Sequence, residues 1–174
     1  RLIGPALKDA ARRGARIRIL TGTYLSITEP SAIYYLLNLL GDAAEIRLFK
    51  DPDRSFHPKA YIFDYHHDPN ASEVYVGSSN LSKSALVTGI EWNYRILRKA
   101  APEDYDRFSE EFERLWEHEA EELKDTALRT YAITWRQNDL ARRESPAYSP
   151  PPRHKPEPRG AQIEALYYLR QARE

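Results

Sequence analysis

The sequence contains no cysteine, which excludes disulfide bonds, zinc sites built from thiolates and catalysis by a thiol. No apolar run is long enough to cross a bilayer, and no stretch is typical of a signal peptide. No Walker A motif is present, so the chain cannot itself hydrolyse ATP. We therefore expect a cytoplasmic protein without a membrane partner.

The formal net charge is zero, because 26 basic side chains balance 26 acidic ones. This balance argues weakly against a nucleic-acid partner, but basic residues crowd positions 8–18 and acidic residues dominate positions 103–125. A basic patch near a site can attract DNA even when the whole chain is neutral. Both clusters are also compatible with solvent-exposed helix faces, and this is our interpretation of the acidic one.

The length and composition suffice for one domain with a core and an appendage, since 41% of the 174 residues are apolar. Hydrophobic periodicity and helix-breaking residues predict helices at 2–13, 29–40 and 81–87, and strands at 16–20, 45–50, 59–65, 73–77 and 91–97. Turn-forming residues at 68–70 place the third and fourth of these strands in one hairpin. This alternation predicts an α/β fold in which helices flank a mixed sheet.

The residues that can perform chemistry fall into two short motifs and one isolated position. The motifs are His57-Pro58-Lys59 and Gly77-Ser78-Ser79-Asn80, and Glu91 follows the second motif by 91 − 80 = 11 residues. Either motif alone is more often an exposed strand or a turn. Together they provide what metal-free attack on a phosphodiester requires: an imidazole nucleophile, an ammonium and neutral donors for the phosphoryl oxygens, and a carboxylate that holds the imidazole in one tautomer.

This pattern resembles the signature of the phospholipase D superfamily, which is His-x-Lys, four residues, Asp, and then Gly-Ser-x-Asn. Asp64 completes the first half, and Glu91 lies about where nuclease-like members place a glutamate that orients the nucleophilic histidine. The resemblance covers residues 1–100 and implies a phospholipase D-like fold. It implies catalytic roles for His57, Lys59, Ser78, Asn80 and Glu91, and structural roles for Asp64 and Gly77.

Three features depart from the family pattern or invite another interpretation. The spacer between the two halves is longer than usual, and the additional residues 65–71 are typical of a hairpin tip. The family fold normally opens with a strand before the first helix, and its apparent absence suggests that upstream residues are missing. His66 and His67 suggest a metal site, but adjacent ligands on a hairpin tip rarely converge on one ion. We therefore expect metal-independent chemistry with no cofactor.

The composition changes after residue 100. Apolar residues at helical spacing predict helices at 102–116 and 126–143, so that residues 101–144 form a helical extension that packs on the domain or, alternatively, a dimer face. Residues 145–160 are proline-rich and predict an extended linker. The segment 158–166 resembles the lead-in to the first ATPase motif of superfamily 2 DNA helicases and restriction translocases. We interpret 161–174 as the start of a helicase-like region, with ATP used only in a part absent from this sequence.

The single His-x-Lys copy has a mechanistic consequence. In-line attack on phosphorus needs a second group on the opposite side to protonate the leaving oxygen. Single-motif nucleases of the family obtain it from a two-fold homodimer, so we expect a composite site with one His57 from each copy. The predicted function is a metal-independent DNA phosphodiesterase or endonuclease fused to a helicase. The alternatives are a catalytically silent DNA-binding and dimerisation module and a lipid phosphodiesterase.

Overall fold

The structure, a computed structural model, describes residues 2–23, 26, 28–51, 54–82, 85 and 87–144. The chain divides into two compact units, residues 1–140 and 141–174, and every residue of the predicted site belongs to the first. The linker predicted at 145–160 and the helicase-like region predicted at 161–174 lie outside the described residues. No helix in the described ranges is both long and apolar enough to span a membrane.

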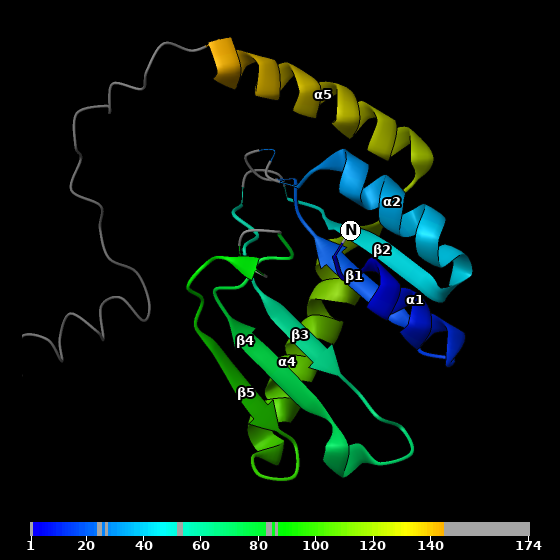
Figure 1. The fold of residues 1–174 in the computed structure, drawn as a ribbon, viewed down its shortest axis with the longest axis vertical. Helices are drawn as coiled ribbons and strands as arrows, with labels where there is room; N and C mark the ends of the chain where they lie inside the picture. The colour runs from blue at the N-terminus through cyan, green and yellow to red at the C-terminus, as the bar shows by residue number, and fades with distance from the viewer. Residues whose placement is uncertain are drawn as a thin grey trace, which may run out of the picture. The chain divides into compact units, whose positions relative to one another are not determined.

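The N-terminal elements alternate between helix and strand (Figure 1). The strands β1 (Ile17–Thr21) and β2 (Ala44–Phe49) belong to the first sheet, and the helices α1 (Gly4–Arg12) and α2 (Pro30–Leu40) precede them in turn. β1 and β2 pair in parallel, as a strand–helix–strand connection requires. Pro30 stands in the first turn of α2, where its missing N–H is tolerated. Gly41 ends the helix with a φ of 51°, and a short 3-10 turn, η2 (Gly41–Ala43), leads into β2. The predicted order of these elements is confirmed.

A third strand of this sheet, β6 (Ala120–Glu122), was not predicted from the sequence. It pairs antiparallel with β2, so that Phe49 lies opposite Ala120. The preceding helix, α4 (Pro102–Arg114), continues into a π-helical turn, Leu115–Glu119, which returns the chain to the sheet. A strand of three residues is too short to show an alternating pattern, and its sequence Ala-Glu-Glu carries no preference for a strand.

The second sheet contains β3 (Ala60–Phe63), β4 (Glu73–Gly77) and β5 (Asn93–Leu97), in that order and all antiparallel. The predicted hairpin is confirmed, and its tip includes the 3-10 turn η3 (Pro69–Ala71). The α/β class is therefore confirmed, with two three-stranded sheets in place of the one mixed sheet expected. Of the helix predicted at 81–87 only residues 81, 82, 85 and 87 are described, and the amide of Ala85 donates to Ser82 Oγ at 3.2 Å, as in a helix cap.

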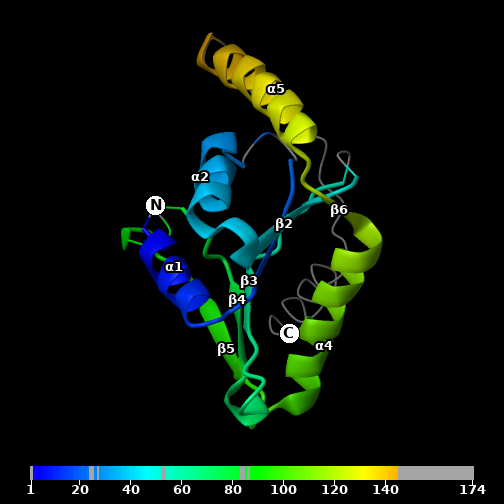
Figure 2. The ribbon, with the colours of Figure 1, turned by 90° about the vertical axis from the view of Figure 1, so that its right-hand side faces the viewer.

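Each sheet has its own hydrophobic core. On the first sheet, Ile33 of α2 and Ile46 of β2 pack with Leu128 and Tyr131 of α5 (Asp125–Glu144). On the second sheet, Val74, Ile96 and Tyr105 form the buried centre. Figure 2 shows α4, which contributes Tyr105, alongside one face of this second sheet. Both helices predicted after residue 100 therefore bury side chains against the strands that precede them.

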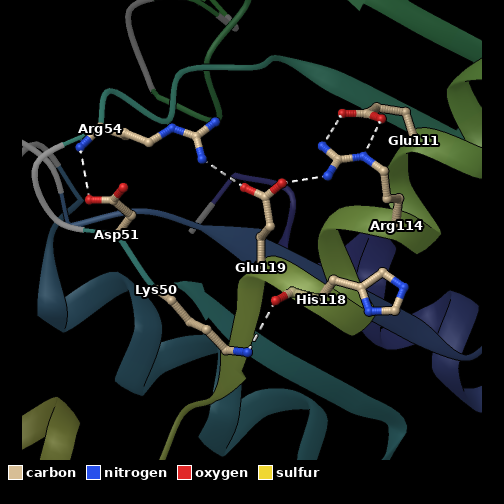
Figure 3. A network of polar contacts seen from close by, with 7 residues as sticks. All are labelled: Lys50, Asp51, Arg54, Glu111, Arg114, His118 and Glu119. Carbon is tan, nitrogen blue, oxygen red and sulfur yellow. Dashed lines mark hydrogen bonds and ion pairs between the residues drawn. The ribbon is translucent and has the colours of Figure 1, made fainter.

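A network of charged side chains connects α4 to the loop that leads to His57 (Figure 3). Arg114 donates two hydrogen bonds to Glu111, each 2.8 Å long, and a further one to Glu119. Arg54, in the loop after β2, donates to the other oxygen of Glu119 at 3.1 Å. The main-chain amide of Lys50 donates to the carbonyl of Glu119 at 2.9 Å. The loop is thus held against the end of the π-helical turn by both ionic and main-chain contacts.

The network predicts a specific acid sensitivity. Hydrogen bonds from Arg114 hold the pKa values of Glu111 and Glu119 below the ordinary value of about 4.3. Their contribution to stability is therefore complete above that pH and is lost as the pH falls through the lowered folded-state values. We expect Arg114→Gln to lower the unfolding temperature at about pH 7, and this difference from the wild type to shrink towards about pH 3.

The measurement is thermal unfolding followed by circular dichroism across this pH range. The matched control is Arg129→Gln, which removes an ion pair between Arg129 and Asp125 on α5, away from the His57 loop. The control breaks one isolated ion pair within a helix, whereas Arg114 joins two carboxylates in a network, so the control should lower the unfolding temperature less than Arg114→Gln does. A difference between wild type and Arg114→Gln that is constant over the whole pH range would contradict the prediction.

Gly77 ends β4 at a point where the backbone passes unusually close to β5. It lies opposite Asn93, and a Cβ atom on Gly77 would stand 2.8 Å from Asn93 Cα and closer still to the carbonyl oxygen of Trp92. Such separations are well inside van der Waals contact, so only glycine fits without moving backbone. The amide of Gly77 also donates to the carbonyl of Lys59 at 3.1 Å. Gly77 therefore joins both neighbouring strands at the end of the second sheet.

We expect Gly77→Ala to lower the free energy of unfolding by about 1–3 kcal/mol, as overpacking of a tight contact does. It should also shift the amide resonances of Trp92 and Lys59. Urea denaturation and a ¹⁵N–¹H spectrum measure the two effects. Gly14→Ala is the control, because Gly14 has a φ of 91° but nothing within 4 Å of an added Cβ. Gly14→Ala should lower stability through backbone strain alone and leave the amide resonances of Trp92 and Lys59 unchanged. If the two variants gave the same spectrum, the close contact of Gly77 with Trp92 and Asn93 would be refuted.

Candidate active site

His57 and Lys59 lie immediately before β3 rather than within a strand. His57 is exposed, and Lys59 is half-buried. Lys59 Nζ lies 2.5 Å from His57 Nδ1 and donates to the carbonyl oxygen of His57 at 3.0 Å. An ammonium group has no acceptor, so Nδ1 is the acceptor and a neutral imidazole in this arrangement carries its proton on Nε2. The arrangement pairs the two motif residues but leaves Nε2 without the free lone pair that a nucleophile needs.

An aromatic contact holds the residue before His57. Phe56 stacks on Phe49, the buried last residue of β2, with ring centroids 4.9 Å apart. On its other side, Phe56 Cβ lies against the backbone of Gly22, where an added Cβ would be 3.0 Å away. The sequence does not identify Phe56, because an aromatic residue beside a motif has no local signal that distinguishes a support from an ordinary core residue. This packing places the His57 segment at the ends of β1 and β2.

A small cavity of about 110 Å³ opens beside His57. This volume holds a few water molecules or one phosphate-sized group. Asn80 of the second motif lines the same cavity as His57, whereas Lys59, Ser78 and Glu91 are not among its lining residues. Its full lining is Leu20, Thr21, Gly22, Thr28, Phe56, His57, Pro58 and Asn80.

The Gly77–Asn80 segment is bound tightly to the start of β5. Ser78 Oγ donates to Glu91 and accepts from the amide of Trp92 at 3.0 Å, and the amide of Ser78 donates to the carbonyl of Trp92 at 2.9 Å. Ser79 is only 8% exposed. By contrast, Asn80 is exposed, and its side chain makes no hydrogen bond within the described part of the chain. Asn80 is therefore available to a ligand, whereas Ser78 is already engaged.

Glu91 has a different partner from the one expected. Its carboxylate accepts the hydrogen bond of Ser78, and no hydrogen bond joins it to His57 among the residues that the structure describes. The pairing of Gly77 with Asn93 places the residues just before β5 opposite Ser78, which accounts for this contact. The predicted orientation of the imidazole by Glu91 is thus not present in this arrangement.

Asp64 lies at the opposite end of β3 from His57. It accepts a hydrogen bond from Ser72 Oγ at 3.2 Å, and the same hydroxyl accepts from the amide of Tyr65 at 3.0 Å. Ser72 is completely buried, so Asp64 acts here in closing the β3–β4 hairpin. His66 stands 3.8 Å from Asp64, and in the described ranges no group of three His, Asp or Glu side chains could hold a metal ion.

Two further residues at the site were missed by the sequence analysis. Tyr61 of β3 donates its hydroxyl proton to the carbonyl oxygen of Ser79 at 2.7 Å, and Asn93 Nδ2 donates to Ser79 Oγ at 2.7 Å. Burial, and then the charge of Glu91, raise the pKa of Tyr61. A tyrosine on a strand is indistinguishable by sequence pattern from a core residue, so only the pairing of the strands identifies these contacts.

The chain was compared with known proteins. The family model described as "Cardiolipin synthase, PLD-like domain" matches residues 1–116, which is 116 of 174 residues and includes both motifs and Glu91. No curated protein matches the chain. The family match agrees with the mixed α/β architecture and with the meeting of the two motifs at one cavity. The chain therefore belongs to the phospholipase D-like domain family, whose members are enzymes of the phosphodiesterase type.

Proposed function

We propose that this protein is a phosphodiesterase that cleaves DNA through a phosphohistidine on His57, in a composite site formed by two copies of the chain. The observation that supports it best is the meeting of His57 and Asn80 at one cavity, with Lys59 against the imidazole. His57 and Asn80, the proposed nucleophile and neutral donor, line a space of phosphate size, and Lys59, the proposed cation, contacts the imidazole of His57. The membership of the phospholipase D-like family supports the same reaction class.

The reaction proceeds in two displacements. Nε2 of one His57 attacks phosphorus, a phosphorus–nitrogen bond forms, and the leaving oxygen departs in line with its electron pair. That oxygen takes a proton from His57 of the partner subunit. Water then attacks phosphorus and gives a proton to the same imidazole, while the phosphorus–nitrogen bond breaks. Lys59 and Asn80 hold the non-bridging oxygens and stabilise their charge in both steps.

Substrate binding must first change the contact between Lys59 and His57. While Lys59 donates to Nδ1, the imidazole proton occupies Nε2 and blocks attack. A phosphate in the cavity offers Lys59 an anionic acceptor, and charge-assisted hydrogen bonds to phosphate are stronger than one to a neutral imidazole. The proton can then reside on Nδ1, leaving the Nε2 lone pair directed at phosphorus. When Ser78 exchanges its hydrogen bond to Glu91 for one to the substrate, the carboxylate of Glu91 can accept a hydrogen bond from the Nδ1 proton of His57.

A second copy is proposed because the chain has one His-x-Lys motif. Exposed apolar side chains flank Glu91, and Trp92 shares two hydrogen bonds with Ser78. Apolar clusters of this kind next to a site are typical of interfaces. We call these residues the β5 apolar patch: Ile90, 94% exposed; Trp92, 82% exposed; and Tyr94, 72% exposed. A partner seated on this patch would bury it and place the two sites beside each other.

DNA is proposed as the substrate on sequence features. The basic residues at 8–18 are mostly exposed, and the segment 158–166, outside the described residues, is similar to helicase lead-ins. A helicase or restriction enzyme is accordingly the proposed parent protein. The description of the matching family names cardiolipin synthase, so a phospholipid is the competing substrate. The competing non-enzymatic role is a silent DNA-binding and dimerisation module.

We expect the wild-type chain to cleave single- or double-stranded DNA in excess EDTA, because the reaction is assigned to side chains rather than to a metal. His57→Ala should lower the cleavage rate by about a thousand-fold or more, as loss of a nucleophile does. His67→Ala, which changes an exposed histidine on the β3–β4 connection, should retain wild-type activity. Gel assays of labelled DNA measure the rates, and acid-labile phosphate on His57 identifies the intermediate.

The same assay distinguishes the competing roles. Hydrolysis of cardiolipin vesicles with no cleavage of DNA would reject DNA as the substrate in favour of a phospholipid. A dimer that binds DNA and cleaves neither substrate would establish the binding-module role. Equal loss of activity in His57→Ala and His67→Ala would contradict the assignment of the nucleophile.

The β5 apolar patch predicts the position of the dimer interface. We expect Trp92→Lys to convert a dimer into monomers and to abolish cleavage, because a charged side chain would be buried at the interface. Ile133→Lys is the matched control, since Ile133 is 62% exposed on α5 and tests the helical extension as the dimer face. Analytical ultracentrifugation measures the mass of each variant. Dissociation by Ile133→Lys but not by Trp92→Lys would move the interface to α5, and an active monomer would refute the composite site.

A further inference from the structure

Tyr61 connects the strand of the first motif to the segment of the second. It stands two residues after Lys59, and its hydroxyl donates to the carbonyl oxygen of Ser79 at 2.7 Å. From the other neighbouring strand, Asn93 donates to the hydroxyl of the same serine at 2.7 Å. Ser79 is therefore held from β3 and from β5, and at 8% exposure it has almost no contact with solvent.

We propose that Tyr61 is a positioning residue that orients Asn80 toward the phosphoryl oxygens by fixing the carbonyl of Ser79. The proposal deepens, and rests on, the phosphodiesterase function proposed above. It assigns to Tyr61 no contact with the substrate, because its hydroxyl proton is already committed to a main-chain acceptor.

The planar peptide unit between Ser79 and Asn80 links the Tyr61 hydrogen bond to Asn80. The carbonyl of Ser79 and the amide of Asn80 belong to one plane and point in opposite directions. A hydrogen bond that fixes the carbonyl therefore also fixes the direction of the Asn80 amide and the position of the Asn80 Cα. Asn80 follows the end of β4 and makes no side-chain hydrogen bond of its own in the described structure. Its orientation at the cavity thus depends on the residue before it.

The environment of Tyr61 keeps it in the role of donor. The hydroxyl is half-buried and lies near the carboxylate of Glu91, and both effects raise its pKa above the ordinary value of about 10. The phenol therefore remains protonated across the neutral range, and a carbonyl oxygen is an acceptor that only a protonated hydroxyl can serve. No other donor to the Ser79 carbonyl is present among the described residues.

Tyr75 provides a matched control. It lies directly opposite Tyr61 in the pairing of β3 and β4 and is half-buried like Tyr61. Its ring contacts Phe63 and the guanidinium of Arg95 rather than the Gly77–Asn80 segment. Tyr61→Phe and Tyr75→Phe therefore remove the same hydroxyl group from the same sheet, and only the first removes a bond to Ser79.

The experiment measures two properties of the full chain carrying each variant. Backbone ¹⁵N order parameters of residues 78–80 should fall from about 0.85 toward about 0.6 in Tyr61→Phe and stay unchanged in Tyr75→Phe. In DNA cleavage, Tyr61→Phe should lower kcat/KM about three- to tenfold, the size expected when one hydrogen bond that positions Asn80 is lost. Tyr75→Phe should retain wild-type kcat/KM.

Each outcome decides the proposal. Unchanged order parameters in Tyr61→Phe overturn it, whether or not the chain cleaves DNA, and so does an equal loss of kcat/KM in the two variants. If the wild-type chain cleaves no DNA, the proposed function fails separately, and titration with inorganic phosphate takes the place of kcat/KM. Weaker phosphate binding by Tyr61→Phe than by Tyr75→Phe then supports positioning, and equal binding overturns it.

Discussion

The passage of β4 against β5 at Gly77 is the constraint on which the candidate site depends. Since Gly77 has no side chain, its backbone contacts Trp92 and Asn93 on one side and bonds the carbonyl of Lys59 on the other. Three chain segments that are distant in the sequence therefore end within hydrogen-bond reach of one another. A side chain at this position would meet the backbone of Trp92 and Asn93, so the close pairing of β4 with the start of β5 requires glycine.

The polar groups around this point divide into those that build the site and those that remain for a ligand. The carbonyl and hydroxyl of Ser79 accept hydrogen bonds from the neighbouring strands, and the hydroxyl of Ser78 donates to Glu91. His57 and Asn80 face the cavity and are exposed. This division follows from hydrogen-bond accounting, since a buried polar segment must satisfy its own groups before it can present others to a substrate.

Elements that follow residue 100 pack against the two sheets that carry this site. α4 covers the second sheet through Tyr105, and its last residue, Arg114, is linked to Arg54 in the loop before His57 through Glu119 of the π-helical turn. β6 closes the first sheet beside β2, next to the stack of Phe49 on Phe56. Residues after position 100 thus stabilise a site whose chemical groups all precede them, which explains why the fold continues past the second motif.

Features that depend on neighbouring residues can be predicted from the amino-acid order alone. Proline and glycine bracket α2, turn residues at 68–70 specify the β3–β4 hairpin, and the two motifs with their spacing identify the phospholipase D-like family. The tertiary structure decided the rest. β6 exists only through its pairing with β2, Glu91 meets Ser78 because of the strand register, and Tyr61 reaches Ser79 across the sheet. Local propensity and motif spacing are encoded within a few residues, whereas register and packing arise from contacts between segments that the sequence order leaves far apart.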